Sequence, residues 1–99
     1  MERKEIEVFA EECNYAIVRM PDRSFPGCVV QGDSLSILLR CAERASALAC
    51  GTGNSELIDE IECLKEALAD RLHHYTSVLT AYGIELPYRQ AAIISKMDK

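Results

Sequence analysis

The spacing of apolar residues predicts a helix over residues 33–50. Apolar side chains recur there every three or four positions, which puts them along one face of an α-helix. They are Leu35, Leu38, Leu39, Ala42, Ala45 and Ala49. Asp33 precedes the pattern, and its carboxylate can accept hydrogen bonds from the free amides of a first helical turn. Gly51 follows the pattern and is typical of the residue just beyond a helix C-terminus.

A second, longer helix is predicted over residues 54–82, beginning at Asn54 or Ser55. Its apolar residues alternate at steps of four and three, as in a heptad seam. The seam consists of Leu57, Ile61, Leu64, Leu68, Tyr75, Val78 and Tyr82. Arg71 interrupts it. The pattern leaves open whether the seam belongs to the core or to a dimer interface.

The connection between these helices, G-T-G-N-S, is short, so the two helices should form an antiparallel hairpin. Gly83 is predicted to end the second helix, with Ile84 folding back on Leu79. Pro87 prevents the helix from continuing. Because two helices cannot bury such wide apolar stripes alone, the N-terminal third or a second copy should pack on them.

The N-terminal third contains smaller elements. Residues 4–9 alternate polar and apolar side chains, which predicts a short strand. Residues 11–20 fit either a short helix capped by Asn14 or a strand that pairs with Cys28–Gln31. We favour the helix.

The expected architecture is therefore mainly α. An antiparallel helix hairpin packs on an N-terminal segment that holds a short strand or small hairpin and, in the favoured interpretation, a short helix. We expect one small globular domain over residues 1–88, followed by an extension over 89–99 that is either a short helix or disordered.

Composition indicates a soluble cytoplasmic protein. The chain has 99 residues, 48% of them hydrophobic, and a net charge of −5. It contains no apolar run long enough to span a bilayer. Its cysteines are odd in number and lack C-x-x-C spacing, so we expect reduced structural thiols. They are Cys13, Cys28, Cys41, Cys50 and Cys63. We expect the cysteines in the helical patterns to pack as small hydrophobic residues.

One face of the second helix is acidic and is our candidate partner-binding site. Its members are Asp59, Glu62, Glu66, Asp70 and His73. A metal site would need matching ligands on the other helix, which offers only Glu43, so we expect no metal and no cofactor. The acidic balance argues against a nucleic acid and favours a basic protein partner. Nothing in the chain suggests a membrane partner.

The segment over residues 23–39 is rich in Gly, Pro, Asp and Ser and is the alternative site. Glycine and proline have turn-making roles there, and Asp33 has a capping role. A small-ligand pocket would use Arg19, Arg23, Gln31, Asp33 and Ser34, since arginine favours carboxylate or phosphate recognition. A serine nucleophile in Gly32-Asp33-Ser34 lacks the strand–turn–helix context of that motif, and nothing brings His73 or His74 near it.

Two motifs resemble those of a family of small bacterial domains of unknown function. They read R-S-F-P-G-C-V-V-Q-G-D-S-L (23–35) and Y-G-I-E-L-P-Y (82–88). The family signature resembles R-x-F-P-G-x-x-x-Q-G-D-S-L with a G-I-E-L-P-Y ending, and the resemblance spans about residues 5–88. It implies a bacterial cytoplasmic origin and transfers no catalytic residue.

These observations favour a non-enzymatic protein-interaction module. One concrete version is an immunity or antitoxin-like protein that blocks a basic toxin with the acidic helix face. The alternatives are a ligand-binding or enzymatic pocket in the 23–34 loop, and a homodimeric structural protein that uses the seam from Leu57 to Tyr82.

Overall fold

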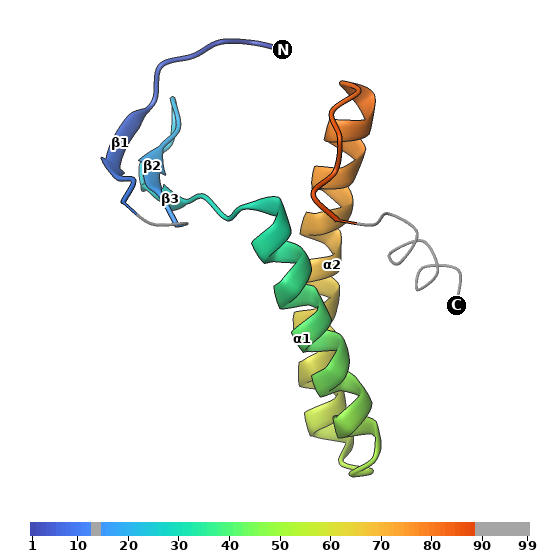
Figure 1. Ribbon diagram of the computed structural model, residues 1–99. Helices are drawn as coiled ribbons and strands as arrows, with labels where there is room; N and C mark the ends of the chain where they lie inside the picture. Colours follow the sequence, from blue (N-terminus) through green and yellow to red (C-terminus); the bar gives the residue numbers. More distant parts are fainter. Residues whose placement is uncertain (13–14, 89–99) are drawn as a thin grey trace. The chain divides into compact units, whose positions relative to one another are not determined.

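The computed structural model describes residues 1–12 and 15–88, and the chain forms two compact units. The first unit is Met1–Gln31, and the second begins at Gly32. The first unit holds a small sheet and the second holds two helices (Figure 1). The elements are β1 (Glu7–Ala10), β2 (Ile17–Arg19), β3 (Gly27–Cys28), α1 (Gly32–Cys50) and α2 (Ser55–Ala81). The prediction of a mainly helical chain is confirmed, whereas a single domain over 1–88 stays a prediction.

The helices α1 and α2 pack side by side and antiparallel, as their short connection predicted (Figure 1). Their buried core is formed by Leu35 and Leu39 from α1 and Leu72 from α2, which is only 1% exposed. Both helices lie within one residue of their predicted bounds at each end. The long apolar periodicity therefore described the hairpin correctly.

Both ends of α2 carry the expected caps. The Asn54 side-chain oxygen accepts a hydrogen bond from the amide of Leu57 at 3.1 Å, which satisfies a free donor of the first turn. At the other end Gly83 has φ +68, and the amide of Ile84 donates to the carbonyl oxygen of Leu79 at 2.9 Å. This is the backbone pattern of the Schellman motif, so the predicted end of α2 is confirmed.

The predicted role of Gly51 at the end of α1 is wrong in detail. The glycine with positive φ in this connection is Gly53, at φ +68. Gly51 instead donates to the carbonyl oxygen of Leu48 at 3.2 Å, and Thr52 donates to that of Ala49 at 3.0 Å. These tight hydrogen bonds extend the last turn of α1, so the left-handed residue comes two positions later.

The N-terminal unit is a three-stranded antiparallel sheet in the order β1-β2-β3. Val8 lies opposite Val18, and Ile17 lies opposite Cys28. The sheet contradicts our preference for a helix within residues 11–20 and matches the alternative strand. The β-branched Ile17 and Val18 favour a strand, and pairing with both neighbours stabilises it. The β1 strand itself begins later than predicted, at Glu7.

Gly32 has a packing role instead of the predicted turn role. It is the first residue of α1 and is buried, and a Cβ added to it would collide with the ring of Tyr75. Asp33 lies inside the first turn of α1, where its Oδ1 accepts a hydrogen bond from the Ser34 amide at 2.9 Å. Because the helix begins at Gly32, Asp33 is not the N-cap that the sequence predicted, although its carboxylate still accepts from one amide of the first turn.

After Gly83 the chain turns back along α2 (Figure 1). Tyr88 packs against the core cluster, and its hydroxyl forms a hydrogen bond with the buried hydroxyl of Thr76 at 2.5 Å. The rings of Tyr75 and Tyr88 lie 6.4 Å apart. The two sequence motifs, which begin at Arg23 and Tyr82, therefore both reach the same part of the helical core. The predicted extension over 89–99 lies outside the described residues.

The four described cysteines are free, as expected, but all of them are exposed. They are Cys28, Cys41, Cys50 and Cys63. The expectation that the helical cysteines act as small core residues is wrong, because the packed faces of the helices use leucine, alanine and serine. Within the described residues, no helix is long and apolar enough to cross a membrane.

Candidate functional site

The acidic face of α2 presents four exposed side chains. They are Asp59, Glu66, Asp70 and His73. Steps of seven, four and three residues place them along one side of the helix, which has 3.6 residues per turn. Among the residues that the structure describes, no hydrogen bond or ion pair engages the three carboxylates. The face is therefore a row of free negative charges about 17 Å long, at 1.5 Å per residue.

Glu62 differs from these four residues because it is half-buried at the contact between the helices. Its Oε1 accepts a hydrogen bond from the hydroxyl of Ser46 in α1 and lies 2.9 Å from Nζ of Lys65. The hydrogen bond from Ser46, and then that from Lys65, hold the pKa of Glu62 below its usual value. Glu62 thus links α1 to α2, and its charge is already compensated within the hairpin.

Sequence reasoning missed the part that Ser46 has in this arrangement. Ser46 is buried on the packed face of α1, seven residues after the core residue Leu39. The sequence did contain a signal for this role, because a serine stands among leucines and alanines at a position that the helical spacing assigns to the packed face. A buried hydroxyl needs a partner, and Glu62 supplies it.

A second candidate region lies in the N-terminal unit, where an open depression of about 320 Å³ borders β1 and the residues after β2. Its lining includes Arg19 and Arg23 from the predicted ligand set. It also includes the acidic residues Glu5, Glu7 and Asp22, so acidic lining residues outnumber basic ones. Such a lining does not favour an anionic ligand.

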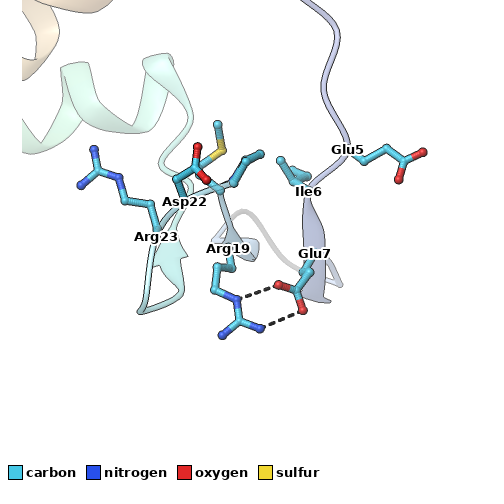
Figure 2. A pocket seen from close by; sticks show the side chains of 8 residues that line it. Glu5, Ile6, Glu7, Arg19, Asp22 and Arg23 are labelled. Atoms are coloured by element: carbon cyan, nitrogen blue, oxygen red, sulfur yellow. Dashed lines mark hydrogen bonds and ion pairs between the residues drawn. The ribbon is translucent and has the colours of Figure 1, made fainter.

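Arg19 is occupied by an ion pair in this depression (Figure 2). Its Nε and Nη2 donate to the two carboxylate oxygens of Glu7 at 2.7 and 2.8 Å. This bidentate pair lowers the pKa of Glu7 and raises that of Arg19. The guanidinium also lies 5.6 Å from the centre of the Phe9 ring. Arg19 thus holds β1 against β2 and has little capacity left for a ligand.

Of the other members of the predicted ligand set, Arg23 joins Arg19 in the lining of the depression, whereas Gln31, Asp33 and Ser34 do not. The side chain of Arg23 extends away from the Glu7–Arg19 pair (Figure 2). Gln31 is exposed at the end of the first unit and does not line the depression. Asp33 and Ser34 belong to the first turn of α1, in the second unit.

The exposed edge of the seam on α2 is the third candidate surface. Leu68, Leu72 and Tyr75 contribute to the core cluster. Four others are 39–57% exposed: Leu57, Leu64, Val78 and Tyr82. The seam therefore lies partly in the hairpin core and partly on its surface.

In the part of the chain that the structure describes, no three His, Cys, Asp or Glu residues are grouped so that they could hold a metal ion. The two candidate surfaces on α2 are thus the acidic face, with its unpaired carboxylates, and the exposed apolar edge of the seam.

Comparison with known proteins gives one match. No significant similarity was found among curated proteins or among solved structures. The model of a family of unknown function, DUF6959, matches residues 1–88, which cover the first unit and the second unit as far as Tyr88. The match agrees with the resemblance to an uncharacterised domain family, although it does not test the two motifs separately. The chain belongs to this family of unknown function, DUF6959.

Proposed function

We propose that this protein is a non-enzymatic protein-interaction module that binds a basic partner through Asp59, Glu66 and Asp70 on α2. The observation that carries the proposal is the absence of any intramolecular partner for these three exposed carboxylates among the described residues. His73 lies at the end of the same face and extends the polar surface. Glu62 supports this face from within the hairpin instead of contacting the partner.

Electrostatics gives the reason for this choice. Carboxylates four residues apart on a helix repel one another and destabilise it by about 0.2–0.5 kcal/mol per pair. Glu66 and Asp70 stand at this spacing, and neither forms an ion pair with a cation in the part of the chain that the structure describes. A basic protein surface would relieve it, and a row of like charges also accelerates association with an oppositely charged partner.

The finer version of the proposal is an immunity or antitoxin-like protein in the bacterial cytoplasm. In this version the basic partner is a toxin whose cationic active or binding surface is covered by α2. The small size and the net charge of −5 suit such a role. A neighbouring gene for a toxin-like polypeptide would supply the candidate to test.

The experiment compares binding by the wild-type chain with binding by the triple variant Asp59→Asn, Glu66→Gln, Asp70→Asn. The candidate partner is titrated calorimetrically at low and at physiological salt. We expect at least a tenfold loss of affinity for the variant and a weaker salt dependence. A matched control, Glu11→Gln, Glu12→Gln, Glu85→Gln, removes the same charge from exposed positions elsewhere and should keep the affinity. Equal binding by both variants would contradict the role of this face.

A homodimer is the second candidate, and the exposed edge of the seam favours it. A ligand pocket in the 23–34 loop receives less support, because Glu7 already satisfies Arg19 and because acidic side chains line the depression.

A further inference from the structure

The exposed edge of the α2 seam forms an apolar stripe that Arg71 interrupts, and we call this stripe the apolar flank. It consists of Leu57, Leu64, Val78 and Tyr82. The first three stand at multiples of seven residues, so they follow a nearly straight line along the helix. Leu64 is the most exposed leucine of this line, at 57%. Large apolar side chains in such an array are typical of a surface that another helix covers.

The apolar flank lies on the side of the hairpin opposite to Glu62. Successive residues of an α-helix are about 100° apart around its axis. In projection down the α2 axis, Glu62 therefore lies on one side of the buried Leu72, and the residues of the apolar flank lie on the other side. The Ser46–Glu62 hydrogen bond identifies the polar side. The same phase argument puts Leu38 of α1, which is also exposed, on the side of the flank. This surface is therefore separate from the acidic face.

Two charged residues accompany the apolar flank. Arg71 stands in the line itself, seven residues from both Leu64 and Val78. Its Nη1 donates to the carbonyl oxygen of Ala67 at 2.8 Å, and no carboxylate of the described chain pairs with it. Glu60 lies beside the line, four residues before Leu64, and is exposed. It too has no ion-pair partner within the described ranges.

We propose that a second copy of this chain covers the apolar flank, with its α2 antiparallel to the first. If Leu57 of one copy faces Val78 of the other, then Leu64 faces Arg71 in both halves of the dimer. The aliphatic stem of Arg71 covers Leu64, and its guanidinium reaches Glu60, which lies one turn away from Leu64. Each copy thus supplies the anion that the other copy's arginine lacks.

The alternative parallel arrangement is disfavoured by charge. It would place Arg71 of one copy against Arg71 of the other, and like charges in a closing interface oppose association. The antiparallel arrangement is also self-complementary, as a two-fold interface requires.

The size of the surface suits a dimer. The apolar flank runs about 37 Å along α2 at 1.5 Å per residue. With α1 beside it at an interaxial distance of 8–10 Å, the face is roughly 20 Å wide, or about 700 Å² per copy. A stable interface of standard size buries about 800 Å² per partner. Two hairpins packed in this way would form a four-helix bundle.

Sedimentation of the full chain tests the proposal, with a reductant present because the exposed cysteines could otherwise cross-link copies. The wild type should change from monomer to dimer with increasing concentration. Leu64→Glu should raise the dimer Kd at least 100-fold, because two-fold symmetry removes the leucine from the interface twice. The matched control is Leu48→Glu on α1, where the leucine is 76% exposed, and it should dimerise like the wild type. Circular dichroism verifies that each variant is folded.

A charge exchange tests the orientation independently of any apolar substitution. Arg71→Glu should raise the dimer Kd about tenfold, and adding Glu60→Arg should restore it. A wild type that stays monomeric up to about 1 mM, the weak limit of specific association, would overturn the dimer. Equal effects of Leu64→Glu and Leu48→Glu would overturn the flank as its surface, and failure of the double exchange would overturn the antiparallel pairing. Because no partner protein is present, these outcomes are independent of the proposed binding by the acidic face.

Discussion

The ring of Tyr75 in α2 lies against the backbone of Gly32 in α1, so closely that even one methyl group between them would collide with the ring. Gly32 therefore allows the first turn of α1 to approach α2. The glycine of the Q-G-D-S-L motif is explained by close helix packing, because its φ is not in the left-handed region.

The first prediction concerns this contact. Gly32→Ala should lower the free energy of unfolding by about 1–3 kcal/mol, because the added methyl group overpacks the core. The measurement is urea denaturation followed by circular dichroism. Gly51→Ala is the control, since its Cβ would meet only the carbonyl oxygen of Leu48 at 3.4 Å, and it should stay within about 0.5 kcal/mol of the wild type. If the two substitutions lower the free energy of unfolding by the same amount, the contact between Gly32 and Tyr75 does not restrict the residue at position 32.

A second prediction concerns the hydrogen bond that joins Thr76 to Tyr88. Thr76→Val and Tyr88→Phe should each destabilise the protein by about 1–2 kcal/mol, because each leaves a hydroxyl without its partner. The double variant should lose less stability than the two single variants lose together, and the difference gives a coupling energy of about 1 kcal/mol between the two hydroxyls. Unfolding of all four proteins in urea gives the coupling. Strict additivity would show that the two hydroxyls do not interact.

The third prediction concerns the centre of the hairpin core. Leu72→Ala should cost about 2–5 kcal/mol, because Leu72 is almost fully enclosed and its removal leaves a cavity. Leu48→Ala makes the same chemical change at an exposed position of α1 and should be nearly neutral. Thermal unfolding of both variants checks this difference, which would disappear if α1 and α2 did not pack as described.

The fourth prediction is a pH dependence that originates at Glu62. Its pKa is lower in the folded protein than its ordinary value of 4.5, so its ionised form stabilises the fold. That contribution is fully present above about pH 4.5 and is lost as the pH falls through the lowered folded pKa. The stability difference between the wild type and Glu62→Gln should therefore be largest near neutral pH and should shrink in acid.

Ser46→Ala provides the control for this effect, because it removes the largest cause of the lowered pKa and leaves the carboxylate in place. The pH dependence of this variant should be weaker than that of the wild type over pH 3–7. A stability difference between wild type and Glu62→Gln that is the same at pH 3 and pH 7 would contradict the assignment.

The helices were predictable because their signals are local and repeated. The apolar residues of α2 recur along its whole length, and Asn54 and Gly83 mark its ends by their own side-chain and backbone chemistry. The sheet was harder to predict, because β2 has three residues and its stability comes from pairing with strands on both sides. A short apolar run does not distinguish a strand from a helix.

The candidate sites depend on contacts between residues far apart in the sequence. The acidic spacing identified the face of α2, but it could not show that Glu62 is engaged by Ser46. Likewise, nothing local indicated that Arg19 is paired with Glu7, twelve residues earlier. The heptad seam was visible from spacing, whereas its division into a buried and an exposed edge follows from the position of α1.

The reversal at Gly83 has a consequence for the order in which the protein is made. Tyr88 completes the packing around Leu35, yet it leaves the ribosome long after α1 has been synthesised. The two helices can meet as soon as α2 has emerged, but their core cluster stays incomplete until the L-P-Y sequence follows. The contacts of Tyr88 with the core cluster can therefore form only after the L-P-Y sequence has been synthesised.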